Sequence, residues 1–185
     1  SMPKEQYDSY MNELSLIEEL KKNKTQSSVL QGIFNLRCIS DHPYLKHYQI
    51  ENIESEKLIN SSAKLKKVIS ILEEVKTKKE KAIIFTDNKS MQRVLRKIIQ
   101  ETFSICPVII NGETPTSKSS NNLSKLSRQQ EIDKFQNVDG FNAIIMSPIA
   151  AGFGLNITEA NHIIHYTRHW NPAKEQQATD RAYRI

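Results

Sequence analysis

Cysteine is scarce in this sequence, and long hydrophobic runs are missing. The 185 residues contain 2 cysteines, Cys38 and Cys106, which are isolated from each other and lack neighbouring pairs of metal ligands. A disulfide framework is therefore not indicated, and the chain fits a reducing compartment. No apolar run approaches the roughly 18 residues that a membrane helix needs, and the first residues do not have the pattern of a signal peptide. We expect an intracellular protein with no membrane partner.

Several familiar catalytic patterns are also absent. The sequence has no Gly-x-Ser-x-Gly, no nucleophile paired with a base, no Gly-x-x-x-x-Gly-Lys-Ser/Thr loop and no acidic pair directly after a strand. These residues therefore lack the phosphate cradle and the magnesium ligands of a nucleotide hydrolase. His162 and His165 are three residues apart in a strand-like run, so they face opposite ways and do not suit a shared zinc ion. The sequence predicts no metal site.

The overall composition is that of a soluble protein large enough for one domain. Charged residues make up 25% of the chain, and the mean hydropathy is -0.54. A chain of this length can bury a sizeable core. The net charge of +5 and the isoelectric point near 9.1 allow an acidic partner, but an excess of this size is also common on ordinary solvated surfaces.

Helical and strand-like patterns alternate through most of the chain. Apolar residues recur at helical spacing over 65–75 and again over 91–99. Short apolar runs without polar alternation, as in buried parallel strands, occupy residues 82–85, 108–110, 143–146 and 163–166. This alternation predicts an α/β fold, a doubly wound parallel sheet with helices on both faces. Functional residues are then expected at the strand ends.

The first part of the chain has a different rhythm. Apolar spacing predicts one helix over residues 7–20 and a second over 29–39, which ends before His42-Pro43. A polar linker is expected around residues 51–62. We therefore expect a helical extension and linker over 1–62 and an α/β lobe over 63–185, whose own C-terminal end could be truncated here.

The end of the chain carries side chains of the kind that bind a polyphosphate. Asn171 is a good N-cap and Pro172 a preorganised first helical residue, so a helix is expected to begin there. Gln177, Arg181 and Arg184 then follow at intervals of four and three, which places one amide and two guanidiniums on one face. Two forked cations on one face suit a polyphosphate. The alternative is an exposed helix with ordinary surface ion pairs.

A glycine-containing turn precedes that helix. The predicted strand that ends at Ser147 is followed by Gly152 and Gly154, which allow a backbone to approach a phosphate closely. Taken alone, such a turn is more often an ordinary connection between a strand and a helix.

The motifs in this order resemble motifs IV, V and VI of the superfamily 2 helicase-like ATPases, and within them the Swi/Snf (chromatin-remodeller) family. The matching segments are His42-Pro43-Tyr44-Leu45, Ser62 to Leu65, Lys81 to Thr86, Asn111-Gly112, Ala150 to Thr158, Trp170 to Ala173 and Gln177 to Arg184. The family motif has a glycine where Ala151 stands, and the patch of residues 114–127, rich in Ser, Asn and Lys, resembles an insertion. The resemblance implies the second RecA-like lobe of a two-lobed motor that hydrolyses ATP while it tracks along double-stranded DNA.

The same resemblance implies roles for particular residues. Arg181 and Arg184 correspond to arginine fingers that stabilise charge on the γ-phosphate, with Gln177 orienting water or bridging the lobes. The further residues implied at the nucleotide are Gly152, Gly154, Asn156 and Asp180. Those implied at DNA are Thr86, Asn88, Asn111, Arg128, Ser147 and Thr158. ATP and Mg²⁺ would be bound mainly by the first lobe of the same polypeptide, so these residues alone are expected to be inactive.

Two other functions are compatible with the sequence. One is a non-catalytic module that binds nucleic acid or protein on a helicase-lobe scaffold. The other is the lobe of an RNA helicase, against which the segments at His42-Pro43 and Trp170-Asn171-Pro172 argue. As a DNA motor lobe, the protein is expected in the cytoplasm or nucleoid of a bacterium or in the nucleus of a eukaryote.

Overall fold

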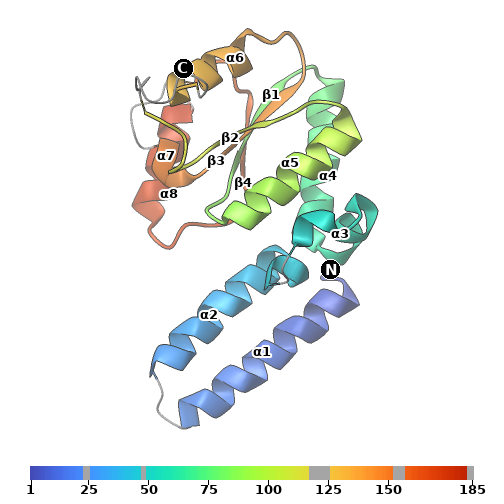
Figure 1. Cartoon of the computed structure of the whole chain (residues 1–185), viewed down its shortest axis with the longest axis vertical. Helices are drawn as coiled ribbons and strands as arrows, with labels where there is room; N and C mark the ends of the chain where they lie inside the picture. The colour runs from blue at the N-terminus through green and yellow to red at the C-terminus, as the bar shows by residue number, and fades with distance from the viewer. Residues whose placement is uncertain (23–25, 47–48, 117–125, 152–156, 183–185) are drawn as a thin grey trace. The chain divides into compact units, whose positions relative to one another are not determined.

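The computed structural model describes residues 1–22, 26–46, 49–116, 126–151 and 157–182 (Figure 1). The chain forms two compact units, residues 1–68 and residues 69–185. Within the described ranges, no helix combines the length and the apolar character that a membrane span needs.

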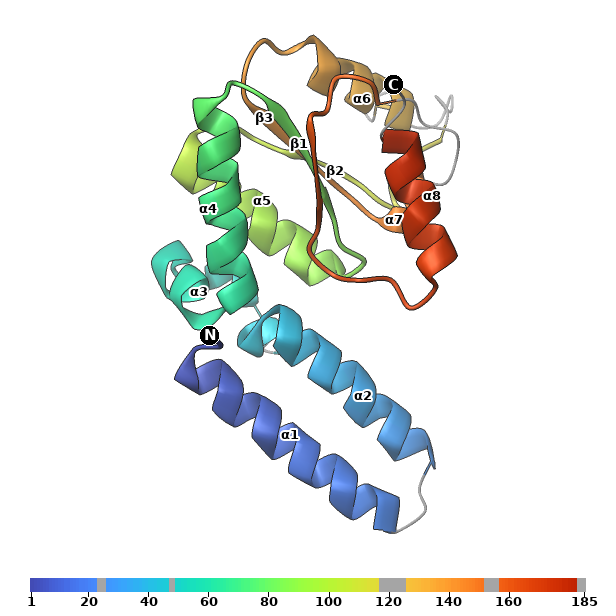
Figure 2. The same ribbon diagram turned by 180° about the vertical axis from the view of Figure 1, so that it is seen from behind.

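The first unit is built on two long helices, α1 (Lys4–Lys22) and α2 (Gln26–Asp41), which confirms the two helices predicted there. They lie side by side in both Figure 1 and Figure 2. Their close approach depends on Gly32, because a Cβ atom at this position would lie 2.4 Å from Cγ1 of the buried Ile17. Not all of the apolar side chains that predict these helices are buried: Tyr7 is 53% exposed and Ile33 is 38% exposed. A pair of helices covers only one side of each partner.

The stretch expected to be a polar linker, residues 51–62, is mostly helical. After the short 3-10 helix η1 (Pro43–Lys46), the chain forms a second 3-10 turn, η2 (Ile50–Asn52), and then α3 (Ser55–Ser61). The helix forms because Leu58 is fully buried and its carbonyl accepts a hydrogen bond of 2.9 Å from Nε2 of His42. Burial lowers the pKa of His42, although this hydrogen bond and the nearby charge of Glu5 oppose the shift. α2 ends at Asp41, directly before His42-Pro43 as predicted, and Cys38 and His42 are both buried.

The second unit contains a parallel sheet of four strands: β1 (Lys81–Phe85), β2 (Val108–Ile110), β3 (Asn142–Met146) and β4 (His162–His165). Their order in the sheet is β2-β3-β1-β4. These are the four strands that the apolar runs predict, within one residue at each end. Every residue of β1 is buried, as expected for a strand with neighbours on both edges and helices on both faces.

Helices cover both faces of this sheet. Residues 69–77 of α4 (Ala63–Thr77) and α5 (Lys89–Phe103) lie on one side, and α6 (Arg128–Asn137), α7 (Pro148–Ala151) and α8 (Pro172–Ala182) lie on the other (Figures 1 and 2). The core on the second side joins Ile83, Phe85, Ile144 and Met146 from the strands to Ile132, Phe135, Ala150 and Ala178 from the helices. The predicted doubly wound α/β fold is therefore confirmed.

Candidate functional site

Polar side chains collect where the parallel strands end. Thr86 follows β1, Asn111 follows β2, Ser147 follows β3, and Thr167 lies two residues beyond β4. All four residues are at least nine-tenths buried. Because the carboxyl ends of parallel strands meet at one edge of a sheet, these residues share what we call the carboxyl edge.

One buried amide, that of Gln92 on α5, joins two of these strand ends. Its Nε2 donates a 2.8 Å hydrogen bond to the carbonyl of Thr86, and its Oε1 accepts a 2.8 Å bond from Nδ2 of Asn111. The hydroxyl of Thr86 is in turn 3.0 Å from that of Thr167, which adds the end of β4. A continuous set of hydrogen bonds therefore ties three strands together at this edge.

Arg128 extends the same set of bonds to α6. Its Nη2 donates to the carbonyl of Asn111 at 3.3 Å, and its Nε donates to the carbonyl of Thr114 at 3.0 Å. The guanidinium is held at the first turn of α6, which begins at a capping box formed by Ser127 and Gln130. We call Thr167, Thr86, Gln92, Asn111 and Arg128 the edge network.

The structure brings together most of the residues that the sequence places at DNA, but not all of them. Thr86, Asn111 and Arg128 belong to the edge network. Asn88 caps α5 by accepting a bond from the amide of Met91, and Ser147 caps α7 through the amide of Ala150.

Thr158 lies apart from the other DNA candidates. Its amide donates a 2.8 Å bond to Gln136 near the end of α6, and the carbonyl of Gln136 accepts from Nζ of Lys81, the first residue of β1. Thr158 is therefore at the amino end of the strands, opposite to the carboxyl edge.

The start of α8 is as predicted, and a carboxylate fixes the segment before it. The helix begins at Pro172, and Oδ1 of Asn171 accepts a 3.0 Å bond from the amide of Ala173. Glu175 turns back on the preceding segment, where its carboxylate lies 2.8 Å from Nε of Arg168 and accepts a 3.0 Å bond from the amide of His169. The entry to α8 is thus held by both a cap and an acidic clamp.

The electrostatics of Glu175 favour its ionised form. Burial alone would raise the pKa of this carboxyl, but the bonds from the amide of His169 and from Arg168, with the charges of His165 and Arg168, lower it overall. Arg168 is 82% exposed, so its ion pair contributes little by itself. The backbone amide of His169 is therefore the partner that contributes more to holding the carboxylate of Glu175.

His165, the last residue of β4, contacts the inner side of α8. Its Nε2 lies 2.9 Å from the hydroxyl of Thr179, and its ring stacks on Phe85 at a centroid distance of 5.2 Å. Burial lowers the pKa of His165; the charge of Glu175 opposes this shift and that of Arg168 adds to it. His162 instead pairs with Glu80, so the two histidines engage different partners, as their spacing predicts. Among the described residues, no three His, Cys, Asp or Glu side chains are grouped to hold a metal ion.

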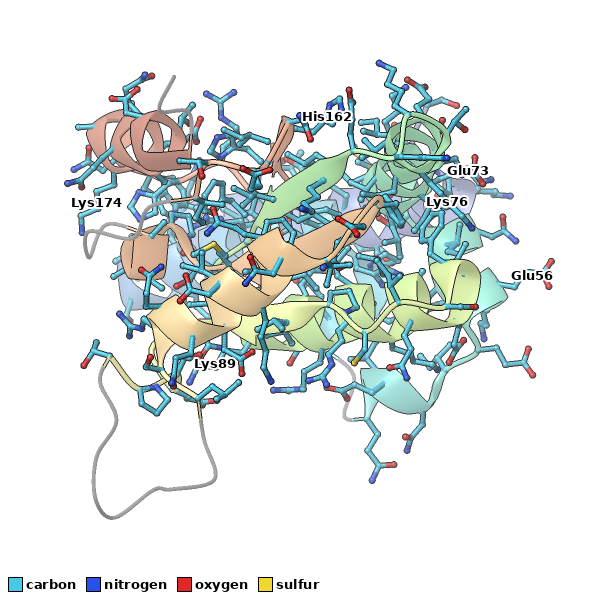
Figure 3. The ribbon with its side chains drawn as sticks, turned by 90° about the horizontal axis from the view of Figure 1, so that it is seen from above. Glu56, Glu73, Lys76, Lys89, His162 and Lys174 are labelled. Carbon is cyan, nitrogen blue, oxygen red and sulfur yellow. The ribbon has the colours of Figure 1, made fainter. Side chains whose placement is uncertain are left out.

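The opposite side of α8 faces solvent. Ala178 is fully buried, whereas Gln177 is exposed, and Lys174 points away from the helix in Figure 3. Helical spacing places position 181 on the same face as Gln177. Asp180 accepts a 2.7 Å bond from Nε2 of Gln176, one turn before it.

The remaining predicted residues lie outside the described part of the chain. They are Gly152, Gly154, Asn156 and Arg184, together with the side chain of Arg181.

Sequence reasoning missed Gln92 and Glu175. A signal for Gln92 is present, because it lies one turn before Leu95 and two turns before Ile99 on the apolar side of an amphipathic helix. A polar residue on the buried side of a helix is more informative than an exposed apolar one. No comparable signal marks Glu175, since an acidic residue in the first turn of a helix is common.

Comparison with known proteins identifies the family of this fold. The model for "Helicase conserved C-terminal domain" matches residues 63–185. In Sulfolobus solfataricus, the SWI2/SNF2 ATPase C-terminal domain is 30% identical, with a TM-score of 0.74 over 93% of this chain and 71% of that one. The chain therefore belongs to the Swi2/Snf2-type helicase C-terminal domains.

Three further relatives are much longer proteins. The Zorya protein ZorD of Escherichia coli O139:H28 is 54% identical over 86% of this chain, and the putative ATP-dependent helicase/translocase YwqA of Bacillus subtilis is 38% identical over 85%. This chain spans only 14% and 16% of their lengths. A structure titled the S. solfataricus SWI2/SNF2 ATPase core in complex with dsDNA is 31% identical, with a TM-score of 0.78 over all of this chain and 36% of that one.

The edge network gives a stability prediction. Gln92→Leu keeps the size of the side chain but leaves the amide of Asn111 and the carbonyl of Thr86 without their bonds to it. We expect the second unit to lose about 2–4 kcal/mol of unfolding free energy, since each buried group left unsatisfied costs roughly 1–3 kcal/mol. Urea denaturation followed by circular dichroism measures this loss. Gln100→Leu, on the exposed side of the same helix, is the control and should change stability by less than about 0.5 kcal/mol. Equal effects of the two substitutions would contradict the role of Gln92.

The clamp on α8 gives a prediction about pH. Because folding lowers the pKa of Glu175, its contribution to stability is present above the unfolded pKa of about 4.3 and is lost as pH falls through the folded value. We expect Glu175→Gln to lower stability by about 1 kcal/mol at neutral pH, because a charged acceptor binds more strongly than a neutral one. The difference should disappear below the folded pKa. Denaturation at a series of pH values tests this, with the exposed Glu159→Gln as the control. A difference that does not change with pH would rule out the charge of Glu175 as its cause.

Proposed function

We propose that this chain acts as the second motor lobe of a DNA-dependent ATPase that translocates along double-stranded DNA. The observation that carries the proposal is the orientation of α8. Glu175, Ala178 and Thr179 hold the helix from its inner side, so that the face of Gln177 and position 181 is presented outward. An outward face with an amide and a guanidinium suits a site completed by another lobe.

The ligand of that face is proposed to be the triphosphate of ATP. Gln177 is exposed, and two arginines follow it at helical spacing; the carboxylate of Asp180, three residues after Gln177, accepts a bond from Gln176. This set of donors fits a polyphosphate. When bound, ATP with Mg²⁺ supplies the phosphoryl group that is transferred to water. Arg181 and Arg184 would stabilise the negative charge on that group, and Gln177 would orient the attacking water or bridge the lobes.

Duplex DNA is proposed to lie along the carboxyl edge. Support comes from the relative described as an ATPase core in complex with dsDNA. Thr86 is fully buried, and Asn111 and Arg128 are nearly so. We therefore assign to these three residues the positioning of the strand ends rather than direct contact with DNA. Gly112, which follows Asn111, is exposed, so its backbone is suited to contact a phosphate.

The remaining parts of the active site are proposed to come from the first lobe of the same polypeptide. The 185 residues contain no phosphate-binding loop of the Gly-x-x-x-x-Gly-Lys-Ser/Thr type. Arginine fingers complete a site but do not create one. The isolated chain is accordingly expected to hydrolyse no ATP above background, and this serves as the baseline of the experiment below.

We expect Arg181→Ala and Arg184→Ala each to reduce DNA-stimulated ATP turnover by about 10³- to 10⁵-fold when the chain is joined to its first lobe. Lysine at either position should restore little activity, because an ammonium cannot reproduce the paired donors of a guanidinium. The fold should survive, since alanine is a strong helix former. Steady-state ATPase assays with and without duplex DNA measure the effect.

Lys67→Ala is the control, because Lys67 is an exposed cation of α4 that takes part in none of the proposed contacts. It should retain most of the activity. Full turnover in both arginine variants, with folding verified by circular dichroism, would mean that the two arginines are ordinary surface residues.

A further inference from the structure

A groove between α5 and α6 borders the edge network, and Gln92 and Asn111 of that network are part of its lining. It has a volume of about 670 Å³, and its lining includes Ile109 of β2 and the segment 113–115. β2 is an edge strand, so the groove runs along the open side of the sheet. No residue of α8 lines it.

Four cations from two helices face this groove. Lys89, Arg93 and Arg96 follow one another at intervals of four and three, so they form a row along one side of α5. The row extends over about 10 Å, given a rise of about 1.5 Å per residue. Lys134 of α6 lines the same groove. All four residues are exposed, and the side chain of Lys89 is 54% exposed.

Two acidic residues, Glu113 and Glu131, also line the groove, and the ion pair that Glu113 makes is weak. Glu113 pairs with Lys89 at 2.6 Å, but both side chains are more than half exposed, at 68% and 54%. Exposed pairs of this kind contribute only about 0–1 kcal/mol, so an incoming anion can replace the carboxylate at little cost. Nη2 of Arg96 donates to Sγ of Cys106 at 3.3 Å, and sulfur is a weak acceptor that a phosphate oxygen would readily replace.

We propose that this groove binds the phosphodiester backbone of a nucleic acid through Lys89, Arg93, Arg96 and Lys134. Asn111 lines the groove and also belongs to the edge network, so the groove continues directly from the carboxyl edge. Among the described residues that line it, none is aromatic, which disfavours stacking of bases and anchoring of a peptide side chain. A row of exposed cations with few apolar neighbours matches a contact to phosphates that does not read the sequence. This inference rests on the proposed DNA-dependent function. It adds the groove to the carboxyl edge as a second surface that contacts DNA.

The test measures binding of a fluorescein-labelled duplex to the whole chain by anisotropy, between about 50 and 200 mM salt. The test variant is Arg93→Glu with Arg96→Glu. Its control is Lys66→Glu with Lys67→Glu, which makes the same change of net charge at two exposed lysines of α4. We expect the test variant to lose at least tenfold in affinity at low salt, and the slope of log affinity against log salt to decrease by about 0.9 for each phosphate that the variant no longer neutralises. The control should lose less than threefold, and Lys134→Glu should weaken binding on its own from the other helix.

The outcomes separate this inference from the proposed function. Equal losses in the test and control variants would overturn the groove as a binding site while duplex binding itself persists. Failure to bind duplex DNA, together with groove-dependent binding of poly-glutamate, would overturn it in favour of an acidic peptide. Groove-dependent DNA binding combined with full ATP turnover in Arg184→Ala, in the joined protein, would support the groove and reject the motor function.

Discussion

The need to satisfy buried polar groups at the carboxyl edge is the constraint on which the candidate site depends. An amide in a protein interior is costly unless its donors and acceptors are bonded. Gln92 meets this need by bonding to Thr86 and Asn111, and these bonds fix the ends of β1 and β2 relative to α5. The position of the loops that leave the sheet at this edge follows from these few bonds. An apolar side chain of similar size at position 92 could fill the same volume, but it would not hold the two strand ends together.

The attachment of α8 follows a related rule with different chemistry. The buried residue at its centre is Ala178, which is small and offers little apolar area. Polar contacts therefore contribute much of the orientation: Glu175 binds the preceding segment, and Thr179 contacts His165. Polar contacts are directional, whereas apolar packing is less so. Under the proposed function α8 presents two positions to another lobe, and directional contacts favour such a role. Both anchors lie two residues from Gln177, so the helical geometry transmits their constraint to the outward face.

Local sequence patterns predict many elements of this fold, although not α3 or α6, because apolar spacing reports which face of a helix or strand is buried. The four strands, the two N-terminal helices and the start of α8 at Pro172 all follow from such spacing. The edge network could not be found in this way, because its bonds join residues that are distant in sequence. Thr86 and Thr167 are 81 positions apart, and nothing in either local segment marks the other. The position of Thr158 could have been deduced, since a residue that precedes a parallel strand belongs to the amino edge and cannot join residues that follow the strands.

The edge network and the basic groove represent two opposite uses of polar side chains. In the network the groups are buried, their partners are fixed, and moving one of them would leave another unsatisfied. In the groove the cations are long and exposed, and the ion pair of Lys89 with Glu113 is weak, so this partner can be exchanged at low cost. A lobe that only had to bind one nucleic acid site tightly would gain from burying its cations and fixing their geometry. A lobe that has to release one phosphate and take the next needs a rigid edge to define the path and adaptable charges beside it, and this is the combination that the second unit contains.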